Sequence, residues 1–237
     1  MSTLIFDIET VGEDFDSLDE TSQDVLTRWI KKESESGESY TTALGDLKNG
    51  MGFSPLTGSI ITIGMYDGER GRGAVYYQSS PGREDKNFEE DVYKFEVMTE
   101  EEMLRKFWDV VEKYDTFVTF NGRQFDVPFL MVRSAIHGIR PTKNLLANRY
   151  LNYHPQNARH IDLYDQLTFY GAMRKKGSLH LWCRAFDIES PKAQGVDGDD
   201  VKTLFDRGQS ADVARYNSRD LKATYELYRK YVDYLQF

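Results

Sequence analysis

Cysteine and long apolar runs are scarce in this sequence. The single cysteine among 237 residues, Cys183, excludes an internal disulfide, and no Cys/His spacing typical of a metal site surrounds it. No stretch approaches the roughly 20 apolar residues that cross a bilayer, and the first residues lack the basic flank and apolar core of a signal peptide. We therefore expect a cytoplasmic protein that does not contact membranes.

Positive charge is also in short supply, with 30 Lys and Arg against 39 Asp and Glu and a net charge of −9. This balance excludes a protein that coats nucleic acid with its whole surface. The charge is uneven, because "EDFDSLDETSQD" is almost purely acidic and polar whereas residues 133–184 are basic. The basic stretch is either a solvated face or a local contact for a polyanion. Its basic residues are Arg133, Arg140, Lys143, Arg149, Arg159, Arg174, Lys175, Lys176 and Arg184.

Hydrophobic periodicity predicts strands that alternate with helices. Helices are expected at 21–32, in "EEEMLRKFWDVVEKY", in "VPFLMVRSAIHG", at 179–186 and along the C-terminal "DVARYNSRDLKATYELYRKYVDYL". Strands are expected at the N-terminus, in a hairpin of "SIITIGMY" and "AVYY", in "DTFVTF" and at the start of "RHIDLYDQLTFYG". The polar "ESESGESYTTALGDLKNGMGFSPLTG" is expected to be a loop within an insertion at about 12–58. With no internal repeat or linker, we expect one α/β domain over residues 1–237.

The first strand, "TLIFDIETVG", carries two acids, Asp7 and Glu9, in an apolar run. Alternate residues of a strand share a face, so the two carboxylates are neighbours. Two like charges about 7 Å apart repel by about 2–3 kcal/mol at an effective dielectric constant of about 20. The acidic face is therefore either exposed to water or built to hold cations.

Two further acids, Asp220 and Asp126, lie at positions where the role of a carboxylate must be explained. Asp220 lies in the inward row of the last helix, one turn after Tyr216, where it either pairs with a neighbouring arginine such as Arg215 or Arg219 or serves chemistry. Asp126, in "TFNGRQFDVPFL", stands at a strand-to-helix turn, where aspartate is also a preferred N-cap that stabilises a helix by about 1 kcal/mol. The row predicted to face inward on the last helix is Val213, Tyr216, Asp220, Ala223, Leu227, Tyr231 and Tyr234.

Taken in order, these segments resemble the three exonuclease motifs of the DEDD superfamily. They read Asp-x-Glu-Thr in the first strand, Asn-x-x-x-Phe-Asp at the turn and Tyr-x-x-x-Asp on the last helix. The tyrosine resembles the DEDDy branch, which includes the proofreading domains of family-B DNA polymerases. "SLHLWCRAFDIESPK" and "GDDVKTLFDRG" also resemble the stretch before the third motif in predicted polymerase-B-like exonucleases.

The resemblance implies a ribonuclease H-like fold, with a mixed β-sheet flanked by α-helices, and a 3′-5′ exonuclease that uses two Mg²⁺ or Mn²⁺ ions. All-oxygen ligands favour these ions over Zn²⁺, and two ions suit phosphodiester hydrolysis. The implied metal ligands are Asp7, Glu9, Asp126 and Asp220, with Tyr216 orienting the attacking water. The implied substrate-binding residues are Thr10, Asn121, Phe125, Arg174, Lys175 and Lys176. The expected substrate is the 3′ end of single-stranded or frayed nucleic acid, with DNA favoured over RNA by the resemblance alone, and any polymerase or repair partner is unknown.

Three alternatives compete with this interpretation, and the first of them is rejected because of its position in the chain. "HIDLYD" has the spacing of a histidine-type third motif through His160 and Asp165, although it does not lie on the terminal helix. A haloacid-dehalogenase phosphatase also begins from an acidic strand motif, but its pattern is Asp-x-Asp and Glu9 occupies the second acid position. A ribonuclease H-like domain that only binds nucleic acid or a partner would need no metal ligands. A nuclease assay with and without EDTA separates the exonuclease from the phosphatase and from the domain that only binds.

Overall fold

The computed structural model describes residues 2–175, 177–194 and 198–236. Seven strands form one mixed sheet in the order β4-β5-β3-β2-β1-β6-β7. Strand β1 is central, since it pairs antiparallel with β2 and parallel with β6. The fold is α/β and its sheet is mixed, as predicted. The strands are β1 (Thr3–Gly12), β2 (Gly58–Asp67), β3 (Arg72–Tyr77), β4 (Phe88–Glu90), β5 (Tyr93–Val97), β6 (Thr116–Thr119) and β7 (Arg159–Asp162).

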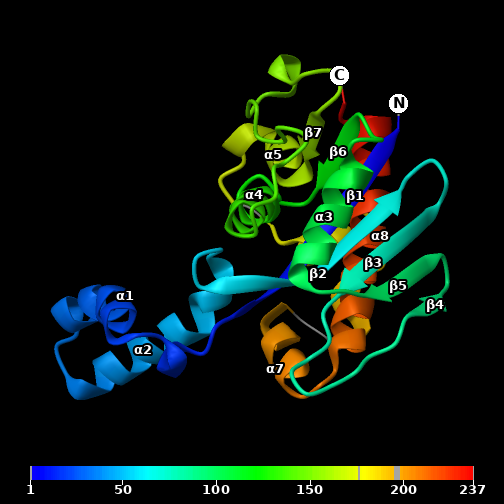
Figure 1. The fold of residues 1–237 in the computed structure, drawn as a ribbon. Coiled ribbons are helices and arrows are strands. Elements are labelled where there is room, and N and C mark those ends of the chain that lie inside the picture. Colours follow the sequence, from blue (N-terminus) through cyan, green and yellow to red (C-terminus); the bar gives the residue numbers. More distant parts are fainter. Residues whose placement is uncertain (1, 176, 195–197, 237) are drawn as a thin grey trace.

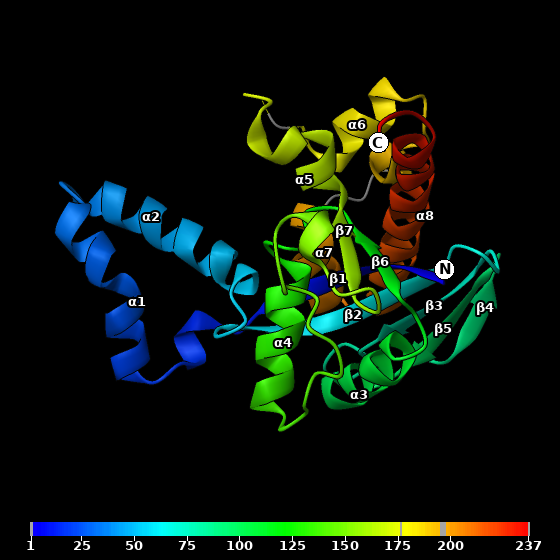
Figure 2. The ribbon, with the colours of Figure 1, turned by 90° about the horizontal axis from the view of Figure 1, so that it is seen from above.

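Helices cover both faces of the sheet. Figures 1 and 2 show α8 on one face and α3 and α4 on the other. The α-helices are α1 (Glu20–Glu33), α2 (Gly37–Gly50), α3 (Glu100–Val111), α4 (Asp126–Ile136), α5 (Leu163–Leu167), α6 (Leu179–Ala185), α7 (Val201–Asp206) and α8 (Ser210–Tyr234). Single 3₁₀ turns lie at Phe15–Ser17, Met51–Phe53, Leu151–Tyr153, Phe169–Gly171, Pro191–Gln194 and Gly198–Asp200.

Alternate side chains of β1 point into two different hydrophobic cores, one on each face of the sheet. Leu4, Phe6 and Ile8 pack into the core that includes residues of α3 and α4, whereas Ile5 packs with residues of α8. Because alternate residues share a face, Asp7 and Glu9 lie on the α8 side of the sheet with Ile5.

The predicted hairpin of β2 and β3 is confirmed, and the helices expected at 21–32, at 179–186 and at the C-terminus all form. The hairpin of β4 and β5 was not predicted. Strand β4 has only three residues and two of them, Glu89 and Glu90, are exposed, so it carries almost no apolar alternation. It forms because β5 already pairs with β3 and offers a free edge.

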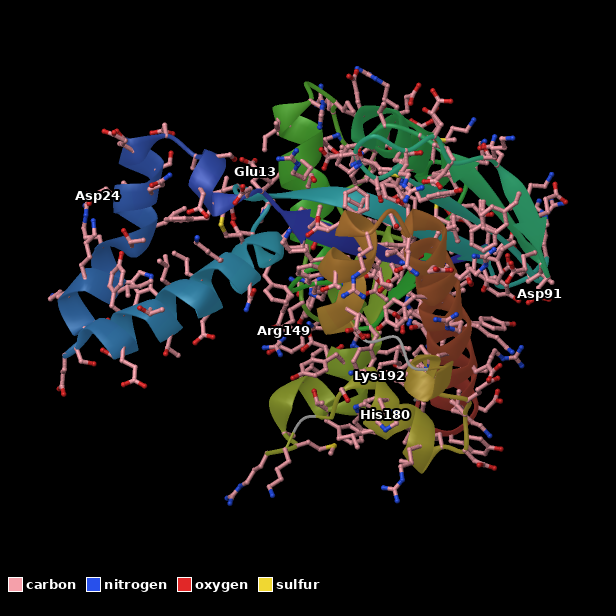
Figure 3. All side chains as sticks on the ribbon, turned by 90° about the horizontal axis from the view of Figure 1, so that it is seen from below. Glu13, Asp24, Asp91, Arg149, His180 and Lys192 are labelled. Atoms are coloured by element: carbon pink, nitrogen blue, oxygen red, sulfur yellow. The ribbon has the colours of Figure 1, made fainter. Side chains whose placement is uncertain are left out.

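The prediction of a loop after α1 was wrong, because α2 is a helix of 14 residues. It begins with a capping box in which Ser36 and Ser39 satisfy each other's backbone amides, but it buries no residue, so it has no apolar face to show in the sequence. We call residues 13–57, between β1 and β2, the insertion arm. Figures 1 and 2 show α1 and α2 projecting from the sheet, and Figure 3 places Glu13 where the arm leaves the body and Asp24 far along it.

The predicted inward row of α8 is correct up to Tyr231, but Tyr234 is 71% exposed. Neighbouring rows are also buried, including Asn217 and Leu221, because α8 packs against β1, β2 and β3 together. The face that α8 buries is therefore wider than a single row. Within the described residues, no helix combines the length and the apolar composition needed to cross a membrane.

Candidate active site

Three carboxylates from the two ends of the chain meet between β1 and α8. Asp7, Glu9 and Asp220 each offer one carboxylate oxygen, and these three oxygens lie within 4.8 Å of one another. The pairing of β1 with β2 is irregular just here, since the register shifts between Glu9 and Thr10. Such bulges re-aim side chains and occur next to active sites. The sequence analysis named all three residues, and the fold brings them together.

The charged forms of Asp7 and Glu9 are strongly disfavoured. Burial is the main cause that raises the pKa of Asp7, followed by repulsion from Asp126, Asp220 and Glu9. Burial also dominates the raised pKa of Glu9, with repulsion from Asp220 and Asp126 next. Both side chains retain some accessible surface, so the cluster is reached from solvent. The charged neighbours that raise both pKa values are all carboxylates, so the cluster has the electrostatics of a cation site.

Asp126 lies beside this cluster without being one of the three closest acids. It is the first residue of α4 and not its N-cap, a position that Phe125 holds without a side-chain hydrogen bond. The carboxylate instead accepts a hydrogen bond from the backbone amide of Ile8 at 3.1 Å, which ties the start of α4 to β1. Burial raises the pKa of Asp126 to about 7, against the lowering effect of its backbone hydrogen bonds. The capping alternative is therefore excluded.

Tyr216 lies on the same face of α8 as Asp220 and is buried to 6% exposure. Burial is the largest cause that raises its pKa, and repulsion from Asp220, Glu9 and Asp7 adds to it. The phenol is therefore protonated at neutral pH and can donate a hydrogen bond.

The sequence left open that Asp220 pairs with Arg215 or Arg219. Arg215 is committed elsewhere, because its guanidinium pairs with Glu90 at 2.8 Å and with Asp212 at 3.1 Å.

One residue of the site was missed from sequence. Asn217 is completely buried, and its Nδ2 donates a hydrogen bond to Asp7 Oδ2 at 2.8 Å. A hydrogen bond from the same amide lowers the pKa of Glu9. The only signal in the sequence was an asparagine next to Tyr216 on a helix with many polar residues, which was too weak to single it out.

The segment "HIDLYD" stabilises the turn of the second motif, "NGRQFD", by hydrogen bonds. The Asp162 carboxylate accepts hydrogen bonds from the amides of Asn121 at 2.8 Å and Arg123 at 3.0 Å, and so fixes the turn in which Asn121 has φ of +67°. His160 is buried, with its ring bonded to Leu145 and Thr119 and its pKa lowered to about 3 mainly by burial. The histidine that would serve the alternative third motif is thus a neutral core residue.

The expected substrate-binding residues lie in different settings. The Thr10 hydroxyl donates to the Gly52 carbonyl at 2.7 Å and anchors the insertion arm to β1. The arm thereby brings Phe53, which is 70% exposed, to 6.3 Å between ring centroids from Phe125. Arg174 and Lys175 are exposed, and Lys176 lies outside the described residues.

Much of the basic stretch is committed to internal contacts. Arg133 pairs with the buried Glu100 at 2.6 Å and Arg149 with the buried Asp165 at 2.7 Å. Lys143 bonds to the backbone carbonyl of Tyr114. The stretch is therefore neither a simple solvated face nor a continuous contact for a polyanion.

Divalent cations fit this site on the chemistry of its donors. The three converging ligand atoms are carboxylate oxygens, which suit hard ions such as Mg²⁺ and Mn²⁺. Burial first, and mutual repulsion second, raise the pKa values of Asp7 and Glu9, and a bound cation would favour the ionised form of both acids.

The family of predicted 3′-5′ exonucleases related to the exonuclease domain of PolB matches residues 79–235, more than half of the chain. The chain belongs to this family. The match includes Asp126, Tyr216 and Asp220 but begins after β1, so the inclusion of Asp7 and Glu9 in this exonuclease-like site depends on their place in the fold.

Curated relatives of this exonuclease-like chain include archaeal DNA polymerases. That of Desulfurococcus sp. (strain Tok) is 27% identical over 155 residues, which are 59% of this chain and 19% of the polymerase. An uncharacterized protein of Methanocaldococcus jannaschii is 28% identical over 141 residues, 55% of this chain and 73% of that protein. The chain thus corresponds to about a fifth of the polymerase.

A solved structure shows the same fold. The family B DNA polymerase of the hyperthermophilic archaeon Pyrobaculum calidifontis superposes with a TM-score of 0.60 at 18% identity, covering 98% of this chain and 24% of that one. The predicted ribonuclease H-like fold, a mixed sheet with flanking helices, is confirmed.

Proposed function

We propose that this chain is a metal-dependent 3′-5′ exonuclease of the DEDDy type, which removes nucleotides from the 3′ ends of single-stranded or frayed nucleic acid. The observation that carries the proposal is the convergence of carboxylate oxygens from Asp7, Glu9 and Asp220 within 4.8 Å, on elements from opposite ends of the chain. Buried acids without a structural need of their own are strong candidates for chemistry. We treat residues 1–237 as one exonuclease domain that carries the insertion arm.

Each acid has a distinct task in this proposal. Asp7, Glu9 and Asp220 would hold one divalent ion, and Asp126 would help to hold a second. Two such ions supply a hydroxide near neutral pH and neutralise charge on the leaving oxygen. The hydrogen bond that Asp126 accepts from Ile8 fixes the start of α4 against β1, so the ligands from three elements keep their spacing.

Tyr216 positions the attacking water in the proposed reaction. Its raised pKa keeps the hydroxyl proton in place at the pH of the reaction, so the phenol acts by hydrogen bonding and not as a base. The carboxylates beside it favour the same protonated form, since an ionised phenol would add one more negative charge to the cluster.

The substrate end is held in this proposal by residues outside the acid cluster. Phe125 with Phe53 offers ring surface on which an unstacked base can stack, a contact that tolerates any sequence. Thr10 follows Glu9 directly and Asn121 stands five residues before Asp126, and Arg174 and Lys175 supply exposed positive charge for the backbone. DNA is favoured as substrate by the relatives that are named DNA polymerases.

A domain that only binds nucleic acid is the competing function. It predicts that Mg²⁺ or Mn²⁺ changes neither the substrate nor the stability of the protein. The crowded acids argue against it, because a pure binding domain would lose stability by retaining them.

The deciding experiment incubates 5′-labelled single-stranded DNA and RNA oligonucleotides side by side with Mg²⁺, Mn²⁺ or EDTA. The proposal expects a ladder of products that shorten from the 3′ end, present with either metal and absent with EDTA. A 3′-phosphorothioate linkage should block the ladder. Intact oligonucleotides under every metal condition would exclude the nuclease and leave the binding domain.

A further inference from the structure

Asn217 is a fully buried amide in the interface between α8 and the sheet. Burying an amide is costly unless its hydrogen bonds are satisfied. Its Nδ2 donates to Asp7 Oδ2 at 2.8 Å, and the same amide is close enough to Glu9 to lower the pKa of that carboxyl. Its Oδ1 is buried and accepts no hydrogen bond from the residues that the structure describes. The hydrogen bonds that orient this side chain therefore come from its NH₂ group and not from its oxygen.

Gly64 is the residue that admits this amide. Asp7 and Gly64 are direct partners in the β1–β2 register, so Asn217 reaches Asp7 across the backbone of position 64. A Cβ at position 64 would overlap the side-chain oxygen of Asn217 and lie 2.8 Å from Leu221 Cδ1. Glycine inside a strand destabilises it relative to alanine and usually marks a close approach of another group.

The chemistry of the clamp matters because an amide is a neutral donor. A lysine or arginine at this place would orient the carboxylates equally well but would also neutralise them and compete with a metal ion. An asparagine fixes Asp7 and leaves the negative charge of the acids for a cation. Polar groups behind metal ligands commonly change metal affinity by about 10–100-fold when they are removed.

We propose that Asn217 is a positioning residue that holds Asp7 as a preformed cation ligand beside Glu9, and that Gly64 provides the space this amide requires. The inference rests on the proposed function in so far as Asp7 and Glu9 bind divalent ions. It adds to the four acids and Tyr216 a residue that acts on the acids and not on the substrate.

The first experiment measures Mn²⁺ affinity by calorimetry on the full chain without nucleic acid. Asn217→Leu removes the donors at similar volume, and Ser218→Ala is the matched control, because that neighbouring hydroxyl bonds only to the helix carbonyl of Arg215. We expect a Kd about 10–100-fold weaker for Asn217→Leu and unchanged for Ser218→Ala. In cleavage assays the loss should be recovered at high Mn²⁺, since the ligands themselves remain. A lowered unfolding midpoint with an unchanged Kd would show a merely structural asparagine and overturn the inference.

The second experiment is a double-mutant cycle of thermal stability at positions 64 and 217, which also serves if Asn217→Leu does not fold. Gly64→Ala alone should be strongly destabilising, whereas in the Asn217→Ala background the same methyl fills the vacated space and costs much less. Equal costs in the two backgrounds would overturn the pairing of Gly64 with Asn217. Wild type that binds Mn²⁺ but cleaves nothing would refute the nuclease alone, and wild type that binds no Mn²⁺ would overturn the inference as well.

Discussion

Glu100, which is bonded to β2, and the acid cluster of β1 and α8 have pKa values shifted in opposite directions. Glu100, 7% exposed, accepts hydrogen bonds from Arg133, from His137 and from the amide of Ile60. Burial acts to raise its pKa, but these bonds outweigh it and hold the pKa below its usual value. Ile60 is the register partner of Thr10, next to Glu9, where burial and like charges raise the pKa instead.

The difference separates a structural acid from an acid kept for chemistry. Burial alone does not distinguish them, since Glu100 and Asp126 are both nearly inaccessible. What differs is the charge of the surrounding groups: Glu100 is surrounded by donors that favour its ionised form, whereas Asp126 is repelled by Asp162 and Asp220. An acid whose native surroundings disfavour its charge is stable only if something else compensates, such as a proton or a metal ion.

The largest effect should follow from Asp7→Asn or Asp220→Asn. Losing metal-borne stabilisation of the transition state should slow cleavage by about 10³-fold or more. The metal-free protein should fold as well as wild type or slightly better, because a repelling charge is gone. Single-turnover cleavage and thermal unfolding without metal measure the two effects, and near-normal turnover of Asp7→Asn would refute the metal assignment.

Glu100→Gln tests the other side of the comparison. Removing one partner of a buried ion pair leaves Arg133 uncompensated, and we expect a loss of about 3–5 kcal/mol in the free energy of unfolding. Urea denaturation measures the loss. Mn²⁺ affinity of the folded variant should stay within threefold of wild type, and a selective loss of metal binding without destabilisation would erase the distinction between the two sites.

Tyr216→Phe should slow hydrolysis by about 10²-fold while metal and substrate binding persist, because only the hydroxyl is lost. His160→Ala is the control from the alternative motif: it should destabilise the core yet leave the rate per folded molecule nearly intact. Single-turnover rates at saturating Mn²⁺ compare the two. The reverse ranking would move the third motif to "HIDLYD".

The raised pKa of Asp126 predicts a pH dependence of stability without metal. Its pKa rises from 3.8 in the unfolded chain to about 7 in the fold, so the native state binds more protons between these values. This contribution to stability is therefore lost as pH rises from about 4 to about 7. His160 works in the opposite direction up to 6.5, so the quantity to follow is the difference between wild type and Asp126→Asn.

We expect the unfolding midpoint of metal-free wild type to fall by several degrees relative to Asp126→Asn between pH 5 and pH 8, and Mg²⁺ at pH 8 to restore it. Parallel midpoints for the two proteins over this range would mean that Asp126 is ionised in the metal-free fold.

The smallest effect concerns Arg174 and Lys175, which are exposed. Arg174→Ala with Lys175→Ala should raise KM a few-fold with little change in kcat, and should reduce the log–log salt slope of single-strand binding by about 0.7 per lost phosphate contact. Binding in Ca²⁺ at several salt concentrations measures the slope. Arg28→Ala with Lys32→Ala on the insertion arm is the control of equal charge. If the two double variants have equal slopes, the nucleic-acid contact lies elsewhere.

The sequence by itself determined the order of the three motifs, the face that Asp7 and Glu9 share on β1 and most helices and strands, since these follow from local periodicity and spacing. It failed at α2, which forms through a capping box and buries nothing, and at Tyr234, where the packed surface ends.

Only the tertiary structure decided which charges meet. It committed Arg133 and Arg149 to buried acids, although the sequence shows them as one basic stretch with Arg174. It also brought Asn217 to Asp7 across Gly64, and Phe53 of the insertion arm to Phe125. These contacts join residues far apart in the chain, and they depend on how closely one element can approach another, which local pattern does not encode.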